Sequence, residues 1–346
     1  MLTPEIDAFI VRMPKVELHL HLEGSMSSQT LLELAERNNI ELPAHNVAGV
    51  EQLLRYRHFS EFLTVYMALV RAVVHGEDFA RLAYELGTDL AAQHVRYAEV
   101  MLSPMQHILR DVDIIEAVAG AAEGFARAHT ETGIRVKLAL DYGRQYGPDR
   151  AWKVLEQASA AMHHGVIAWS IGGNEIGHPP EPFAEVFAEA RRIGLHLMAH
   201  AGEVVGPESV WGAVDALQVE RVGHGIRSID DPHLLHYLRE KQTVIDVCPS
   251  SNLYTGAATS WQAHPLRQLY DYGLNVTVNS DDPTFFYTTI TEEYRRIVMH
   301  FGFTVDELCH LTRNAVYGSF LPPYEKHTLW HEMEREIKRL RQELGV

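Results

Sequence analysis

Two histidines near the start of the chain are spaced so that both can bind one metal ion. His19 and His21 lie one residue apart in the apolar run KVELHLHL, residues 15–22. Side chains two positions apart on a β-strand point to the same side, so both imidazoles face one way. His200 and Asp281 follow other predicted strands and complete a set of three histidines and one carboxylate. Such a set is typical of a cation like zinc, with one coordination position left for water.

Three further residues are placed to handle protons or substrate beside that metal. Glu203 follows His200 by three residues in the segment HAGE, the usual offset of a proton-shuttling carboxylate that does not bind the metal. His224 lies between two glycines in VGHG and is a second acid–base or anion-stabilising candidate. Asp282 adjoins Asp281 and is expected to accept a hydrogen bond from the substrate. Because a bound metal lowers the pKa of water to ~7, this set predicts hydrolysis at an electrophilic carbon.

The fold that positions these residues is predicted to be a barrel. Short β-branched or apolar runs alternate with amphipathic, helix-like stretches along the chain. Strands that alternate with helices pair in parallel, and eight such units predict a single (β/α)8 TIM-type barrel over residues 1–346. A doubly wound open sheet is the alternative. The runs are 15–22, 95–102, 135–141, 166–173, 196–203, 221–226, 243–249 and 274–282.

Polar or small residues follow or end each predicted strand. In a barrel the carboxyl ends of all strands converge on one face, where active sites form. Besides the residues above, this set contains Glu99, Ser103, Asp141, Gly172, Gly173, Ser250 and Ser251. The histidines and carboxylates are therefore expected to meet in one site.

Two segments do not fit a simple strand–helix repeat. Residues 23–94 are too long for one crossover and predict a helical insertion over the barrel mouth, either a mobile lid or a fixed cap. Residues 324–346 are charged and predict a solvated outer helix, with a subunit contact as the alternative. Monomer and homodimer both stay open.

The charge balance excludes several classes of partner. The 346 residues contain 30 Lys and Arg against 46 Asp and Glu, a formal net charge of −16. Such a surface repels nucleic acid and anionic lipid, and the sequence has no apolar stretch of ~20 residues to span a membrane. Two cysteines, Cys248 and Cys309, make no disulfide framework. We therefore expect a cytoplasmic protein that acts on a small molecule.

Five segments identify the chemistry more closely. PKVELHLHLEG, AHAGE, RVGHG, CPSSN and NSDDP occur in this order between residues 14 and 283. They resemble the adenosine deaminase family of zinc amidohydrolases. The resemblance implies one zinc ion per chain, with the ligands His19, His21, His200 and Asp281.

The same resemblance implies how a 6-aminopurine is held and attacked. Glu203 would protonate ring nitrogen N1, and His224 would orient or deprotonate the water that attacks C6. Asp282 would hydrogen-bond N7, and the backbone N–H of Gly173 would meet N3. The expected reaction releases ammonia and leaves a 6-oxopurine.

The motifs point to different substituents at N9 of the purine. We expect a nucleoside, with adenosine converted to inosine. Glu23 stands in HLEG where adenosine-type members read HLDG, and relatives that act on free adenine share the HLEG form. RVGHG looks like the adenosine type, whereas SIGGNEIG, residues 170–177, looks closer to relatives that act on aminodeoxyfutalosine. Free adenine and aminodeoxyfutalosine are therefore the alternative substrates.

Two other functional classes fit the sequence less well. Binuclear amidohydrolases bridge two metals with a modified lysine at the end of the fourth strand, but residues 154–240 contain no lysine. A purine-binding protein without catalysis would need a gap in the ligand or acid set, and the sequence has none.

Overall fold

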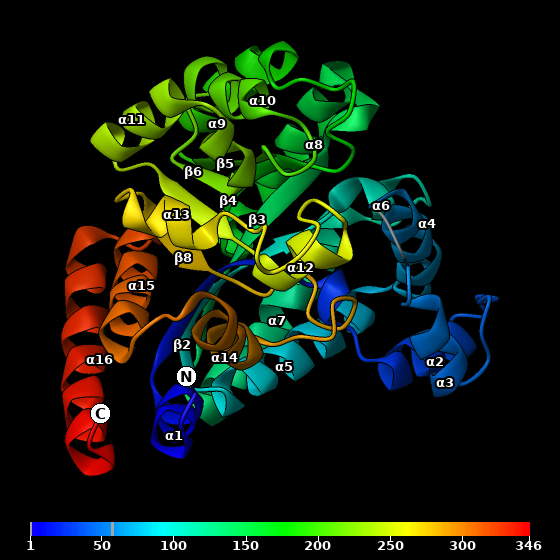
Figure 1. Cartoon of the computed structure of the whole chain (residues 1–346). Coiled ribbons are helices and arrows are strands. Elements are labelled where there is room, and N and C mark those ends of the chain that lie inside the picture. The colour runs from blue at the N-terminus through cyan, green and yellow to red at the C-terminus, as the bar shows by residue number, and fades with distance from the viewer. Residues whose placement is uncertain (1, 57–58) are drawn as a thin grey trace.

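The computed structural model describes residues 2–56 and 59–346, which form a (β/α)8 barrel (Figure 1). Eight parallel strands pair in the sequential order β1 to β8. This order confirms the predicted barrel, because a doubly wound sheet would reverse its strand order partway across. The strands are β1 (Lys15–His21), β2 (Val95–Leu102), β3 (Arg135–Gly143), β4 (Val166–Gly172), β5 (His196–Ala201), β6 (Arg221–His224), β7 (Val244–Val247) and β8 (Asn275–Val278).

The seam between β8 and β1 closes through the residues just after β8. The backbone N–H of His21 donates to the carbonyl of Asp281 at 2.9 Å, and the N–H of Asp281 donates to the carbonyl of His19 at 3.1 Å. The side-chain oxygen of Asn279 also accepts from the N–H of His19 at 3.2 Å. Three of the four predicted metal ligands are therefore fixed in position by closure of the barrel itself.

A buried ion-pair cluster fills part of the barrel interior. Arg221 of β6 lies 2.6 Å from a carboxylate oxygen of Glu99 on β2 and 2.6 Å from one of Asp246 on β7. All three side chains are buried, so the charges compensate one another away from water. Glu99 does not reach the mouth as the sequence predicted, because β2 continues past it to Leu102.

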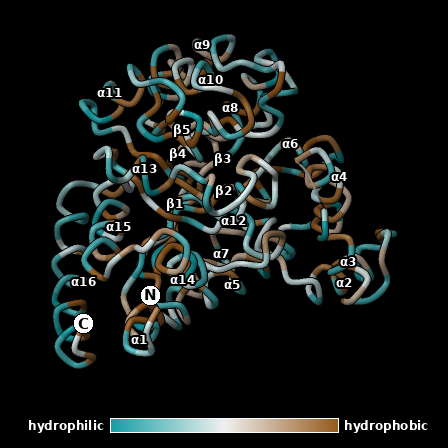
Figure 2. Tube along the Cα trace, viewed as in Figure 1, coloured by the Kyte–Doolittle hydropathy of each residue, from teal (hydrophilic) through white to brown (hydrophobic). Residues whose placement is uncertain are grey.

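Helices cover the outside of the barrel, and hydrophobic residues gather in the central strands (Figure 2). The helix α7 shows why these segments start and stop where they do. The side chain of Asp113 accepts hydrogen bonds from the first turn, and Gly133 ends the helix in a left-handed conformation. The covering helices are α1 (Pro4–Arg12), α7 (Ile114–Thr132), α8 (Pro148–Ala161), α9 (Ala184–Arg192), α11 (Pro232–Lys241), α13 (Leu266–Asp271), α14 (Ile290–Phe301), α15 (Val305–Gly318) and α16 (Pro323–Leu344).

The segment from β1 to β2 contains the helices α2 (Ser28–Arg37), α3 (Val47–Leu53), α4 (Phe59–Leu69) and α5 (Gly76–Ala92). The last of these packs against α7 and forms the crossover to β2. Figure 1 places α2, α3 and α4 away from α16, at the side where α6 (Pro104–Ile108) lies. That this segment acts as a lid stays a prediction.

Shorter elements complete the connections. The remaining helices are α10 (Pro207–Trp211) and α12 (Pro249–Tyr254), with short turns at η1 (Glu23–Ser25), η2 (Val70–Ala72), η3 (Arg144–Tyr146), η4 (Met162–His164), η5 (Glu181–Phe183), η6 (Gly212–Ala216) and η7 (Ile226–Asp230).

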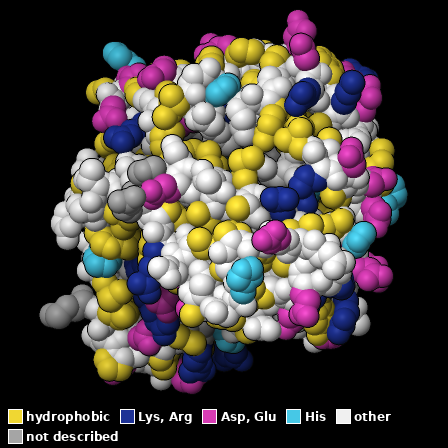
Figure 3. Space-filling view, turned by 90° about the vertical axis from the view of Figure 1, so that its right-hand side faces the viewer, with side chains coloured by type: hydrophobic (Ala, Val, Ile, Leu, Met, Phe, Trp, Pro, Cys, Tyr) yellow, Lys and Arg dark blue, Asp and Glu magenta, His cyan; other side chains and the backbone are white. Residues whose placement is uncertain are grey.

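The C-terminal helix packs on neighbouring helices, and the surface seen in Figure 3 has charges of both signs. The helix α16 packs on α1 and α15 through Leu329, Met333, Ile337 and Leu340, which recur at helical spacing. On the face seen in Figure 3, acidic and basic side chains are interspersed with hydrophobic ones. Within the described residues, no helix has both the length and the apolar character needed to cross a membrane.

Candidate active site

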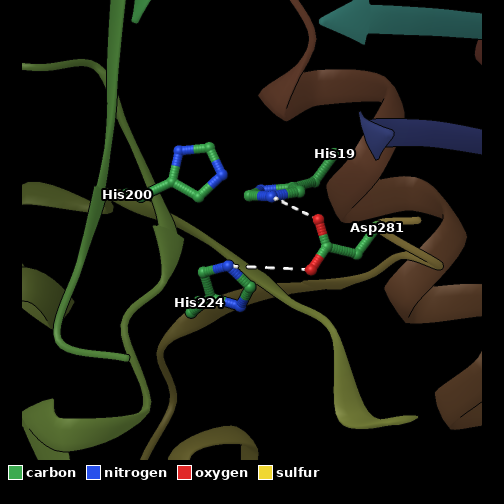
Figure 4. Close-up of side chains that lie close together, drawn as sticks. All are labelled: His19, His200, His224 and Asp281. Atoms are coloured by element: carbon green, nitrogen blue, oxygen red, sulfur yellow. Dashed lines mark ion pairs between the residues drawn. The ribbon is translucent and has the colours of Figure 1, made fainter. Parts of the chain in front are cut away.

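Histidines from three strands and one aspartate surround a common space at the carboxyl end of the barrel (Figure 4). Donor atoms of His19, His200, His224 and Asp281 all lie within 4.8 Å of one another. His19 Nε2 and His21 Nε2 each lie 3.3 Å from Oδ1 of Asp281. Three of the four ligands predicted from the sequence, His19, His200 and Asp281, thus share one donor group with His224, and the fourth, His21, adjoins this group through Asp281.

The cluster has the chemistry that a divalent cation requires. The side chain of His19 is fully buried, and neither of its ring nitrogens has a hydrogen-bond partner among the described residues. A buried imidazole is rarely left in that state, because unmade hydrogen bonds cost free energy. A cation bound between His19 and the carboxylate of Asp281 would satisfy both groups. These residues therefore fit a metal ion such as zinc.

A carboxylate behind His200 orients that ring. His200 Nδ1 lies 3.4 Å from Oδ1 of Asp141 and 3.3 Å from the carbonyl of Ile171. The hydroxyl of Ser170 donates to the same Asp141 oxygen at 2.6 Å. Metal-binding histidines commonly use one ring nitrogen in this way, which leaves the other for the metal. The sequence placed Asp141 at a strand end but did not predict its partner.

Two residues of the cluster have strained backbones. His224 has φ 62° and Asp281 has φ 67°, in the left-handed region that non-glycine residues rarely adopt. Each such residue costs of order 1 kcal/mol and persists only where the surroundings enforce it. Both follow or end a barrel strand, so the strain turns the chain sharply and directs these side chains into the site.

Glu203 lies in the turn after β5 and is suited to donate a proton. Its side chain is buried, Oε1 accepts a hydrogen bond from the hydroxyl of Thr255 at 3.1 Å, and Oε2 lies 3.7 Å from His224 Nε2. Burial raises the pKa of Glu203 well above its usual range, and the negative charges of Asp281 and Glu175 raise the pKa further. This shift favours the protonated form of the side chain, the form that a general acid needs.

Glu175 shapes the turn that carries Glu203, and the sequence did not single it out. Its carboxylate accepts from the backbone N–H groups of Gly202 at 2.6 Å, Val204 at 2.9 Å and Val205 at 3.0 Å. The signal that could have found it is a lone carboxylate just past the β4 strand end, in GGNE. Glu175 fixes the backbone on both sides of Glu203.

A cavity of about 90 Å³ adjoins the cluster. Its polar lining residues include His21, Asp141, His200, Glu203, His224, Asp281 and Asp282. Its apolar and aromatic lining residues include Phe59, Phe62, Leu63, Tyr66 and Met67 of α4, with Met105 and Phe286. A cavity that combines apolar and aromatic walls with a few polar groups suits a heterocycle.

Two predicted substrate contacts, Gly173 and Asp282, line this cavity. Gly173 has φ +82°, in the left-handed region that favours glycine, and a Cβ there would also require the end of the Gln145 side chain to move. Oδ1 of Asp282 is buried and has no hydrogen-bond partner among the described residues. Burial raises the pKa of Asp282 well above its usual range, and the charges of Asp281 and Glu23 add to this effect.

Glu23, the third predicted substrate contact, lies behind the cavity wall. Its side chain is fully buried, and Glu23 is absent from the residues that line the cavity. Oε1 accepts from the backbone N–H of Ser103 at 3.0 Å and lies 2.8 Å from His107 Nε2. The guanidinium of Arg110 donates to the other ring nitrogen of His107 at 3.0 Å, so Nε2 of a neutral His107 is the donor to Glu23.

Comparison with known proteins gives relatives over nearly the whole chain. Adenine deaminases of Hahella chejuensis and Rhodospirillum rubrum are 34% and 36% identical, and the alignments cover 95% and 92% of this chain and 98% and 95% of theirs. The crystal structure of an adenine deaminase from Arthrobacter aurescens matches with a TM-score of 0.90 and 33% identity over 94% of this chain and 99% of its own.

A further solved structure bears on the metal. An amidohydrolase from Burkholderia ambifaria with bound Zn matches with a TM-score of 0.92 and 29% identity over 100% of this chain and 96% of its own. The family profile described as Adenosine deaminase matches residues 14–336. The resemblance inferred from the five segments is thus confirmed, and this chain belongs to the adenosine deaminase family.

Proposed function

We propose that this chain is a zinc-dependent adenine deaminase, which hydrolyses free adenine to hypoxanthine and ammonia. The sequence favoured adenosine and held adenine as an alternative. The relatives named adenine deaminase, which match almost the full chain, support the alternative better. The partner is then a small purine base.

The position of Glu23 is the observation that favours a free base over a nucleoside as the substrate. In adenosine-type members the residue at this position is an aspartate that reaches the sugar hydroxyl. Here the longer carboxylate is fully buried; Oε1 is engaged by His107 and Ser103, and Oε2 has no hydrogen-bond partner among the described residues. A carboxylate with no surface in the cavity offers a ribose no partner.

The metal ligands we propose are His19, His21, His200 and Asp281, which hold one zinc ion per chain. Their convergence and the unpaired nitrogens of His19 support this set. When bound, zinc supplies a water nucleophile at neutral pH, because the cation lowers the pKa of water to about 7.

The chain's own residues would then bind adenine and move its protons. Glu203, protonated and buried beside the cluster, gives its proton to N1 as C6 is attacked, which prepares the amino group to leave as ammonia. The raised pKa of Asp282 favours its protonated form, which would donate a hydrogen bond to N7 rather than accept one as the sequence predicted. The backbone N–H of Gly173 contacts N3, and the aromatic side chains of α4 cover the ring.

Substrate comparison tests this proposal. Zinc-loaded protein should be assayed on adenine, adenosine and aminodeoxyfutalosine by the loss of ultraviolet absorbance. We expect kcat/KM to be at least about 100-fold higher for adenine than for either nucleoside. Faster turnover of a nucleoside would refute the choice of substrate while leaving the reaction class intact. Metal analysis should give one zinc per chain, and a value near two would favour a binuclear site.

A further inference from the structure

A chain of three hydrogen bonds connects a backbone N–H group to His224. The N–H of Leu266 donates to Nδ1 of His264 at 3.1 Å. Nε2 of His264 lies 3.1 Å from Oδ1 of Asn252, and Nδ2 of Asn252 lies 3.1 Å from Nδ1 of His224. The side chains of Asn252, His264 and His224 are all buried. Water therefore does not compete for these bonds.

The backbone N–H of Leu266 sets the donor-to-acceptor direction of all three hydrogen bonds. A backbone N–H only donates, so Nδ1 of His264 must accept. Burial lowers the pKa of His264 to about 4, so the ring is neutral at pH 7 and carries its hydrogen on Nε2. That hydrogen points at Asn252, whose amide must present oxygen to His264 and its NH2 group to His224. Nδ1 of His224 is then an acceptor, and its hydrogen lies on Nε2.

We propose that Asn252 and His264 are positioning residues that hold His224 in the tautomer with hydrogen on Nε2, so that His224 donates a hydrogen bond into the site and is not a metal ligand. This inference deepens the proposed function, on which it rests for the identity of the site.

The assigned tautomer resolves which histidines bind the metal. On distance alone, His224 belongs to a four-residue donor group with His19, His200 and Asp281. A ring nitrogen that carries hydrogen has no free lone pair for a cation. His224 Nε2 instead faces two carboxylate oxygens, 3.7 Å away on Glu203 and 3.9 Å away on Asp281. Without His224 this group keeps His19, His200 and Asp281, and His21, whose Nε2 lies 3.3 Å from Asp281, completes the proposed ligand set.

The same tautomer also separates the two roles considered for His224. With hydrogen on Nε2, His224 orients an oxygen atom by donating to it and cannot remove a proton through that nitrogen. Reversing the donor-to-acceptor direction of these hydrogen bonds would turn an N–H of His264 toward the N–H of Leu266. Two buried donors would then face each other without an acceptor, so reversal is opposed by the backbone.

An isosteric substitution should reverse the last bond of this chain. In Asn252→Asp, a carboxylate replaces the amide and accepts from both His264 and His224, which moves the hydrogen of His224 to Nδ1. Asn275→Asp makes the same chemical change in a half-buried residue at the start of β8 and serves as the control. We expect kcat/KM for adenine to fall at least about 10-fold in Asn252→Asp and to stay within about 2-fold in the control.

The decisive readout is nitrogen NMR of histidine-labelled protein, with and without zinc. Nitrogen shifts distinguish a ring nitrogen that carries hydrogen from one that does not, and His224→Gln assigns the signals. We expect hydrogen on Nε2 of His224 in the wild type and in Asn275→Asp, and on Nδ1 in Asn252→Asp. Hydrogen on Nδ1, or metal-bound Nε2, in the wild type would overturn the inference even if Asn252→Asp does not fold. The NMR spectrum does not depend on turnover, so a protein that does not deaminate adenine can still show the assigned tautomer of His224.

Discussion

Replacement of Glu203 by Gln should remove most turnover and leave the metal in place. The change preserves the length of the side chain and an oxygen for the hydroxyl of Thr255, which now donates to Oε1 at 3.1 Å. It removes the acidic proton, whose retention burial favours by raising the pKa of Glu203. A glutamine amide can donate a hydrogen bond but cannot transfer a proton to N1 and recover it.

The size of the effect follows from the role assigned to Glu203. A positioned general acid contributes roughly 10²–10⁴-fold to a rate. At about 1.4 kcal/mol for each factor of ten, this loss corresponds to about 3–6 kcal/mol of transition-state stabilisation. We expect kcat on adenine to fall by that factor. In the wild type, activity should fall as pH rises through the raised pKa of Glu203, because the proton donor is then lost.

Steady-state absorbance assays on adenine, together with zinc analysis of the same samples, measure both parts of this prediction. Glu208→Gln is the matched control, because Glu208 is exposed on α10, five residues further along the chain. A Glu203→Gln enzyme that carries one zinc per chain and keeps more than about a tenth of the wild-type kcat would refute the general-acid role.

Substitutions elsewhere in the site separate metal binding, positioning and choice of substrate. His21→Ala should lose zinc, measured after dialysis by metal analysis, and full retention would exclude His21 as a ligand. Glu175→Gln weakens the hydrogen bonds that the carboxylate accepts from the turn carrying Glu203. Because a hydrogen bond to a charged group contributes about 1.5–3 kcal/mol, kcat/KM should fall about 10–100-fold while zinc is retained. Unchanged kinetics would contradict the positioning role of Glu175. Glu23→Asp shortens the side chain whose carboxylate contacts His107. We expect kcat/KM on adenine to fall about 10-fold and the ratio of adenosine activity to adenine activity to rise. An unchanged ratio would show that other residues determine the specificity.

The barrel and the metal cluster were predictable because both follow from strand periodicity. Short apolar runs that end in polar residues mark parallel strands, and barrel closure brings those ends to one face. His19, His21, His200 and Asp281 are therefore found from local sequence, although they are up to 262 positions apart in the chain. The error at Glu99 has another origin: the predicted run 95–102 matches β2, but Glu99 lies inside that strand and its carboxylate pairs with the buried Arg221.

The hydrogen bonds that hold the site residues in place could not be predicted from strand periodicity. Glu175 acts on the turn after β5 from the loop after β4, and His264 reaches Asn252 from the connection between α12 and α13. These contacts depend on the paths of loops in space, which no periodicity encodes. The burial of Glu23 is similar, since the side chain that engages it, His107, lies on a different helix, α6. The sequence flagged Glu23 as unusual but placed it at the substrate.

The formation of hypoxanthine and ammonia from adenine by purified protein, before and after removal of zinc, tests the central claim most directly. The account predicts equal amounts of the two products with one zinc per chain, loss of the reaction when a chelator removes the metal, and recovery when zinc is restored. Protein that carries one zinc per chain and forms no hypoxanthine, or that keeps its full activity without metal, would contradict the proposed zinc-dependent deamination of adenine.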